Sequence, residues 1–133
     1  MEAAGEKEKV SAGNKYGAKK SVADGITFDS RREMERYHEL KLLQQGRAIS
    51  GLKLQPRFEL IPKQDRAKRI GERGLVYWQE GEPAVHYTAD FEYYENGLHI
   101  VEDVKGVRTR DYVLRRKLFK QKYPEIIFRE TVT

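Results

Sequence analysis

The sequence predicts an α/β domain in which a mixed β-sheet is flanked by helices, in the order helix, strand, strand, strand, helix, strand. Apolar residues recur at helical spacing in two stretches, residues 30–46 and 109–123, which predicts the helices. Strand-like segments fill the space between them and follow the second one. An Asn96-Gly97 pair, the strongest short hairpin signal in the chain, joins two of these strands.

The composition fits one globular but polar domain. Of the 133 residues, 38% are apolar and 35% are charged, which allows a modest core. The absence of cysteine excludes disulfides, thiolate catalysis and cysteine zinc sites. A net charge of +5 favours a polyanionic partner such as nucleic acid. Neither a hydrophobic signal core nor an apolar run of about 20 residues is present, so we expect a soluble cytoplasmic protein without a membrane partner.

The chain is expected to begin with a flexible basic tail, residues 1–20, followed by a single domain, residues 21–133. Val22–Phe28 is predicted as a short extended piece that turns at Asp24-Gly25. The first helix then begins at Ser30 and ends at Gly46. Its apolar side is formed by Met34, Tyr37, Leu40, Leu42 and Leu43.

Leu52–Leu60 alternates apolar and polar residues, which predicts a half-buried strand. Pro56 cannot donate a ladder hydrogen bond and therefore indicates a sheet edge or a bulge at that position. Residues 62–74 are charged and contain glycine, so they are predicted as a loop or an insertion.

Leu75–Trp78 and Ala84–Tyr87 flank a turn-like Glu80–Pro83 segment and are predicted to form an inserted β-hairpin. The second arm of this hairpin should run on to Tyr94. Strand alternation along it predicts one apolar face formed by Tyr87, Ala89, Phe91 and Tyr93, with Asp90 on the opposite face.

The third strand is predicted over Leu98–Val104. A second helix should run from about Thr109 to Tyr123, where Pro124 ends it. Its expected core residues are Leu114, Leu118 and Phe119. Residues 125–132 are predicted as the final strand.

Two carboxylates and one lysine are predicted to meet on this hairpin. Residues two apart on a strand share a face, so Asp103 and Lys105 point the same way while Glu102 points the other way. Asp90 lies on the preceding strand, and the turn between the strands can bring it to Asp103. Each residue alone is more typical of a solvated surface or a weak salt bridge, and it is their joint spacing and the hairpin that favour a functional site.

These residue types fit metal-assisted hydrolysis of a phosphodiester. Magnesium takes hard oxygen ligands, keeps several waters and is commonly held by one or two carboxylates. The lysine can stabilise charge on the phosphate or act as a base, and the sequence leaves both roles open. Glu33 on the first helix is a further metal candidate, although Ser30 to Glu33 also fits a capping box.

At these residues the chain resembles the PD-(D/E)xK nuclease superfamily, most closely its small phage and prophage proteins. The resemblance covers most of the chain from about residue 15. The matching segments are Lys15–Lys20, Phe28–Glu33, Arg36-Tyr37, Leu54–Phe58, Ala89–Phe91, Glu102–Gly106 and Tyr123-Pro124. It implies an αβββαβ restriction-endonuclease-like core. Ala89 stands where the superfamily motif has proline, a position that varies.

The resemblance implies a role for each matched residue. Asp90 and Asp103 would be the metal carboxylates, with Val104 part of the metal site, Lys105 the catalytic lysine and Glu33 the helix-borne acid. Gln55 would be a weaker polar site residue, and Glu102 would replace Asp103 if a bulge changed the strand parity. The implied cofactor is Mg²⁺ or Mn²⁺.

The implied activity is that of a phage-encoded, structure-selective endodeoxyribonuclease similar to Holliday-junction resolvases, acting in DNA recombination within the host-cell cytoplasm. The expected partner is DNA, including branched DNA, and paired cuts in opposing strands would favour a homodimer. A basic helix should seat the DNA backbone through Arg108, Arg110, Arg115, Arg116, Lys117 and Lys120. Two alternatives remain open: a nucleic-acid-binding phage protein without catalysis, and a subunit active only in a larger recombination or packaging complex.

Overall fold

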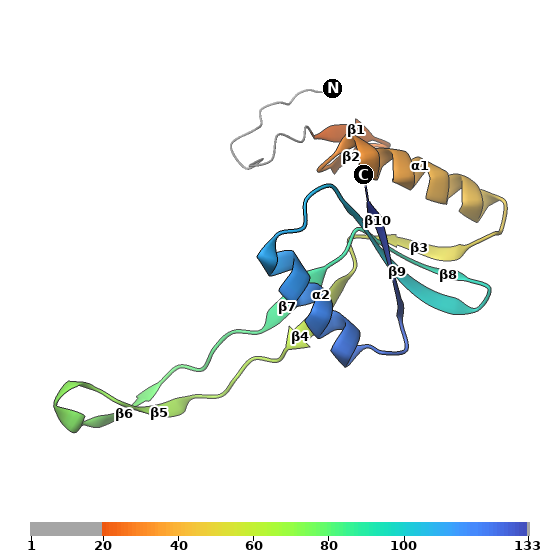
Figure 1. Cartoon of the computed structure of the whole chain (residues 1–133). Helices are drawn as coiled ribbons and strands as arrows, with labels where there is room; N and C mark the ends of the chain where they lie inside the picture. Colours follow the sequence, from red (N-terminus) through yellow and green to blue (C-terminus); the bar gives the residue numbers. More distant parts are fainter. Residues whose placement is uncertain (1–19, 133) are drawn as a thin grey trace.

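The computed structural model describes residues 20–132 (Figure 1). The predicted tail therefore lies outside the described residues apart from Lys20, whose ammonium pairs with Asp29 at 3.0 Å. The helices and strands are β1 (Ser21–Ala23), β2 (Ile26–Phe28), α1 (Arg31–Gln45), β3 (Ser50–Leu54), β4 (Arg57–Ile61), β5 (Ala67–Ile70), the 3-10 turn η2 (Glu72–Gly74), β6 (Val76–Gln79), β7 (Val85–Thr88), β8 (Phe91–Glu95), β9 (Leu98–Lys105), α2 (Arg110–Lys122) and β10 (Ile127–Val132).

A mixed four-stranded sheet forms the centre, in the order β10-β9-β8-β3. β8 and β9 form the predicted hairpin across Asn96 and Gly97, which have the positive φ values of 53° and 77° that such a turn requires. β3 pairs with β8 antiparallel, whereas β10 returns through α2 and pairs with β9 in parallel. The predicted mixed sheet flanked by helices is thus confirmed as an α/β arrangement.

The two helices cover opposite faces of this sheet. The strand β9 shows this, since its neighbouring side chains point to opposite sides and pack against different helices. Ile100 packs in a core cluster with Tyr37 and Leu40 of α1. Val101 packs in a second cluster with Phe119 of α2. The sheet is therefore buried between two helical layers, and side chains from both faces meet near the end of β9.

Both helices begin at the predicted caps. Ser30 Oγ accepts the Glu33 N–H at 3.1 Å, and Thr109 Oγ1 accepts the Tyr112 N–H at 3.1 Å. The expected apolar stripes are wider than the buried ones. Leu42 and Leu43, predicted on the apolar side of the first helix, are exposed, and so is Leu114, for which the prediction of a core position is wrong. The spacing of apolar residues predicts which side of a helix faces the sheet, but the sheet covers only the middle of that apolar side.

The strand predicted over residues 52–60 is two strands, β3 and β4, interrupted at Gln55-Pro56. Gln55 has a φ of 53° and Pro56 has no N–H, so neither residue continues a regular ladder. The neighbouring strand breaks beside it, between β7 and β8. Gln55 N donates to Asp90 O at 2.9 Å and Ala89 N donates to Pro56 O at 3.0 Å, which ties the two breaks together.

This double break changes which face each residue occupies. Tyr87 and Ala89 pack on the α2 side, whereas Phe91 and Tyr93 pack on the α1 side. The single apolar face predicted for these four residues is therefore wrong. The break also lets Asp90 turn towards β9.

The inserted hairpin has different partners from those predicted. β6 pairs with β5 across a turn at residues 71–75, while β7 pairs with β4, so Glu80–Pro83 is not a hairpin turn. Gly71 N donates to Leu75 O at 2.8 Å, and Gly74 takes a φ of 76°. The segment of residues 62–84, here called the arm, projects away from the sheet and both helices (Figure 1, green).

Candidate metal and phosphodiester site

Asp90 is held against β9 by two hydrogen bonds. Its backbone N–H donates to Glu102 O at 3.2 Å, and its Oδ2 accepts the Val104 N–H at 2.7 Å. Because backbone and side chain are both fixed, the carboxylate lies close enough to Asp103 for the charge of Asp103 to raise its pKa. The structure thus brings together the two acids that the sequence places on neighbouring strands.

Asp103 is fully buried on β9. The Tyr87 hydroxyl donates to its Oδ2, and Lys105 Nζ lies 3.3 Å from its Oδ1 as an ion pair. Oδ1 nevertheless has no hydrogen-bond partner within residues 20–132, because the ammonium is not aligned for one. A buried carboxylate oxygen without a donor is costly, which makes this atom a candidate ligand for a cation.

Lys105 continues this face of β9 towards α2. Its ammonium lies 4.4 Å from the centre of the Tyr112 ring, a cation–π contact. The lysine is only partly exposed, with 26% of its side chain accessible. It is therefore held beside Asp103 while still open to solvent or a substrate.

Glu33 is buried at the first turn of α1. Burial and the nearby Asp29 and Asp103 carboxylates raise its pKa to about 7, while a backbone hydrogen bond at Asp29 and the Lys105 charge oppose the rise. Ser30 caps the helix through the Glu33 N–H, so the capping contact involves the backbone of Glu33 and leaves its carboxylate near the other acids. Glu33 can therefore take part in the helix cap through its backbone N–H and in the candidate site through its carboxylate.

Asp90 has a pKa that is raised further above its ordinary value than that of Glu33. Burial, the charge of Asp103, a hydrogen bond that protonated Asp90 donates to Asp103 and the charge of Glu33 raise its pKa to about 9, opposed by the Val104 N–H. Repulsion among buried carboxylates is a common mark of a site that binds positive charge or does acid–base chemistry.

The residues present fit a hard divalent cation. Within residues 20–132 no three His, Asp or Glu side chains are already arranged as a complete ligand set. Magnesium needs only one or two protein carboxylates, since waters complete its shell, and Asp90 with the donor-free Oδ1 of Asp103 meets that need. Val104 packs its side chain against α1, so only its backbone carbonyl is available for metal contact.

Glu102 lies on the opposite face from Asp103, as strand parity predicts. Its carboxylate accepts two hydrogen bonds from Arg36, at 2.7 and 3.1 Å, and others from Tyr93 and Thr131. Burial raises its pKa, but the hydrogen bonds from Arg36 and Tyr93 outweigh that effect and lower it. All of its acceptor capacity is used inside the fold, so Glu102 joins α1 to the sheet.

We expect Glu102→Gln to destabilise the fold by about 2 kcal/mol, because the charge-assisted hydrogen bonds from Arg36 disappear. Urea unfolding measures this change. The affinity for Mg²⁺, measured by calorimetry on the folded variant, should stay at the wild-type value. A loss of Mg²⁺ binding without destabilisation would contradict the structural role of Glu102.

Two tyrosines of the site were not predicted from the sequence. Tyr87 binds Asp103, although simple alternation places it on the face opposite Asp90. Tyr112 lies under Lys105 from α2. Gln55 contacts the site only through the hydrogen bond that its backbone N–H donates to Asp90 O, and its side chain is exposed. No local sequence signal identifies Tyr112, whereas Pro56 is the clue to the break that places Tyr87.

The six cations predicted to bind DNA on or beside α2 fall into two groups. Arg108 and Arg116 pair with Glu130, and Arg115 pairs with Asp111 and donates to His86 O. Burial raises the Glu130 pKa, but hydrogen bonds from Arg108 and Tyr112 dominate and lower it to about 2. Three of the six cations are therefore already engaged within the chain.

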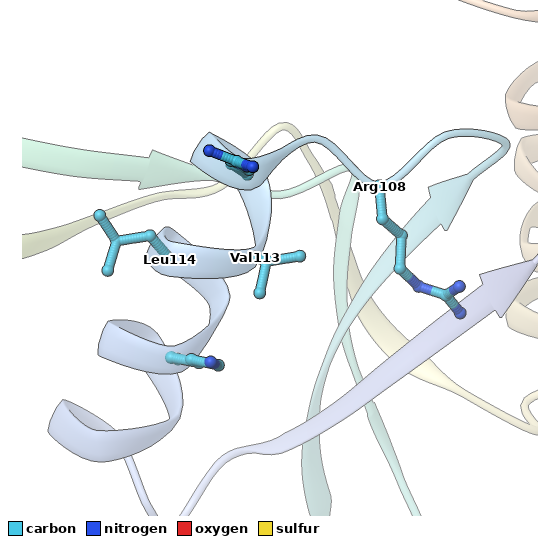
Figure 2. Close-up of a pocket in the computed structure, with 5 residues that line it drawn as sticks. Arg108, Val113 and Leu114 are labelled. Atoms are coloured by element: carbon cyan, nitrogen blue, oxygen red, sulfur yellow. The ribbon is translucent and has the colours of Figure 1, made fainter.

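The remaining cations are exposed and have no salt bridge within residues 20–132: Arg110, Lys117 and Lys120. Arg110 and Lys117 line a shallow hollow of about 270 Å³, together with Arg108, Val113 and Leu114 (Figure 2). Lys120 lies 5.3 Å from the Phe128 ring. An anionic ligand on this helix would meet these cations first.

Across residues 20–132, neither helix has the length and apolar character needed to cross a bilayer.

Comparison with known proteins gives one match. Residues 13–132 match the profile of a family described as "Protein of unknown function (DUF1064)". No curated protein and no solved structure matches the chain. Because the matched segment spans nearly the whole sequence, the chain belongs to the DUF1064 family.

Proposed function

We propose that the protein is a metal-dependent endodeoxyribonuclease of the PD-(D/E)xK type. The observation that carries this proposal is the pair of acids Asp90 and Asp103, with the donor-free Oδ1 of Asp103 beside Lys105 and with Glu33 near enough for the Asp103 charge to raise its pKa. Burial and the neighbouring carboxylates raise the pKa of Asp90 and of Glu33, so both acids favour a compensating positive charge, which Mg²⁺ or Mn²⁺ would supply through the oxygen ligands available here.

The order of elements supports the same interpretation. If β3 with β4, and β7 with β8, each count as one interrupted strand, the chain runs α1, three antiparallel strands, α2 and a parallel strand. This order matches the αβββαβ order expected of the nuclease core. Asp103 lies on the third of these strands and Asp90 lies in the break of the second, and that superfamily carries its metal ligands on the corresponding strands.

In this proposal, Asp90 and Asp103 hold the metal, and Glu33 completes the site directly or through water. The metal supplies Lewis acidity and a bound water of lowered pKa. Lys105 either stabilises charge on the phosphate or accepts a proton from the attacking water. Tyr87 keeps Asp103 oriented through its hydrogen bond. Water adds to phosphorus with loss of a proton, the P–O bond to the leaving DNA end breaks, and the freed oxygen takes up a proton and leaves as a hydroxyl.

The deciding experiment incubates the purified protein with linear duplex, single-stranded and four-way-junction DNA in Mg²⁺, Mn²⁺ or EDTA. We expect cleavage in the metal buffers alone, with faster cutting of branched than of linear DNA if the enzyme is a phage-type structure-selective nuclease. Tight DNA binding without any cleavage would favour the non-catalytic alternative. Cleavage that appears only after a partner protein is added would favour the subunit alternative.

A second test concerns the DNA backbone. Arg110→Ala with Lys117→Ala should weaken DNA binding and lower the salt-dependence slope by about 0.9 for each phosphate that the variant no longer neutralises. The matched pair Arg115→Ala with Arg116→Ala should mainly lower thermal stability, because those side chains bind Asp111, His86 and Glu130. Affinity titrations at several salt concentrations measure the first effect and thermal unfolding measures the second. Equally weakened DNA binding in both pairs would contradict this division.

A further inference from the structure

The arm carries a set of exposed apolar side chains that the fold does not bury. Ile70, Leu75, Val76, Tyr77 and Trp78 all lie open to solvent, with Trp78 54% exposed. Within residues 20–132, β5 and β6 pair only with each other. A two-stranded ribbon is at best marginally stable alone, and a patch of exposed apolar groups usually marks a binding surface.

The apolar groups lie among cations. The far end of the arm, residues 66–79, carries Arg66, Lys68, Arg69 and Arg73 against the single acid Glu72. None of these four cations forms a salt bridge with the described part of the chain. The arm's other acids, Asp65, Glu80 and Glu82, lie at its base.

The register sorts these groups into faces. Lys68 is opposite Trp78 and Ile70 is opposite Val76, so the four share one face of the ribbon. The charged ends of Arg66 and Lys68 lie 5.4 and 5.5 Å from the Trp78 ring centre. The Arg66 and Lys68 charges lie over the ring of Trp78, which is still half exposed, so this face combines positive charge with apolar surface in a way that suits phosphates beside the edges of bases.

The same features argue against a second copy of the chain as the partner. Two arms packed together would bring their cations face to face, in a protein that already carries a net charge of +5. Nucleic acid instead offers negative charge together with apolar groups at the base edges, such as the thymine methyl. The major groove of duplex DNA also admits a two-stranded β-ribbon.

The arm is joined directly to the candidate site. It continues β4 and β7, and those strands lead at their other ends to Pro56 and Asp90. Its base is tightly closed, since a Cβ on Gly81 would lie 1.9 Å from Gln64 O. Trp78 precedes Asp90 by twelve positions, which sets a reach of up to about 40 Å for an extended chain, or roughly one turn of duplex DNA.

We propose that the arm binds the DNA duplex that flanks the cut, up to about one helical turn from Asp90. Arg66, Lys68 and their neighbours contact phosphates, and the Trp78 face lies against bases in the major groove. The position of the cut rests on the proposed nuclease function. DNA binding by the arm does not, because it is measured without cleavage.

The test measures DNA affinity in EDTA for duplexes of about 30 and about 8 base pairs, of which only the longer spans the arm. Trp78→Ala should weaken binding to the long duplex about tenfold, and Trp78→Phe should restore most of it. Arg66→Ala with Lys68→Ala should reduce the salt slope by about 1.8. Affinity for the short duplex should not change.

Arg47→Ala with Lys53→Ala is the matched control, since it removes the same charge from exposed positions outside the arm. An arm-excised chain, with residues 65–81 replaced by Asn-Gly, keeps the fold because Gln64 N already donates to Glu82 O at 2.9 Å. Its thermal unfolding and its short-duplex affinity report that the remaining domain is intact.

The inference is overturned if the arm-excised chain binds the long duplex as tightly as wild type. It is also overturned if the wild-type protein binds no DNA, or if sedimentation shows a dimer that needs the arm while DNA affinity does not. Arm-dependent binding without metal-dependent cleavage would sustain the inference and reject the nuclease proposal. Metal-dependent cleavage at the same rate with and without the arm would sustain the nuclease proposal and reject the inference about the arm.

Discussion

Asp103→Asn is expected to lower the rate of Mg²⁺-dependent DNA cleavage by about a thousandfold. The substitution keeps the size of the side chain and its acceptor for the Tyr87 hydroxyl, but removes the charge at the donor-free Oδ1. Metal affinity should fall together with the rate. Single-turnover cleavage and calorimetric Mg²⁺ titration measure the two effects on the same protein.

Lys105→Met should reduce cleavage to a similar extent while leaving Mg²⁺ binding nearly intact, because the lysine is not an oxygen ligand. The pH–rate profile then separates its two candidate roles. A base at Lys105 would give wild type a rising limb that the variant lacks, whereas a charge stabiliser would lower the rate equally at all pH values.

Matched surface variants control for the chemistry of the substitutions. Asp111→Asn makes the same change at a side chain that is 70% exposed on α2, and Lys53→Met removes an exposed lysine from β3. Both should cleave at the wild-type rate. If Asp103→Asn cleaves as fast as Asp111→Asn, the metal-site proposal is wrong.

The parts of the fold that could be predicted are those set by local sequence. Ser30 and Thr109 cap their helices, and Asn96 and Gly97 turn the hairpin. Each of these features depends on residues a few positions apart. The hairpin brings the strand ends that carry Asp90 and Asp103 together, although the orientation of Asp90 also depends on the break before Phe91.

The parts that could not be predicted depend on contacts between distant segments. The breaks at Gln55-Pro56 and before Phe91 stabilise each other through backbone bonds across two strands. Together they move Tyr87 to the same side as Asp103. The prediction for the arm failed for a similar reason, because Glu80–Pro83 looks like a turn while the real turn uses Arg73 and Gly74 in left-handed conformations.

The stability of the metal-free protein is expected to fall as the pH rises from about 5 to 8. The folded state holds Asp90 at a pKa of about 9 and Glu33 at about 7, both above their ordinary values of 3.8 and 4.5. Over this range the unfolded chain therefore binds fewer protons than the folded chain. A raised folded pKa of this kind stabilises the protein fully below the unfolded value and is lost as the pH passes the folded value.

One proton of difference over three pH units corresponds to about 4 kcal/mol. Glu130 acts in the opposite direction, since its pKa of about 2 contributes stability that is lost only in acid. The stability of the protein in EDTA should therefore be highest near pH 5. Urea unfolding at pH 5, 6.5 and 8 measures the slope.

Magnesium should reverse this slope, because it binds the ionised carboxylates and replaces the protons that they otherwise retain. The stabilisation by Mg²⁺ should accordingly be small at pH 5 and large at pH 8. Asp90→Asn should be more stable than wild type in EDTA at pH 8, since it keeps the acceptor for the Val104 N–H without the charge. It should also respond less to Mg²⁺. If Asp90→Asn and wild type lose the same stability as the pH rises, repulsion among these acids does not set the pH dependence. The proposed metal would then have no excess negative charge at the site to neutralise.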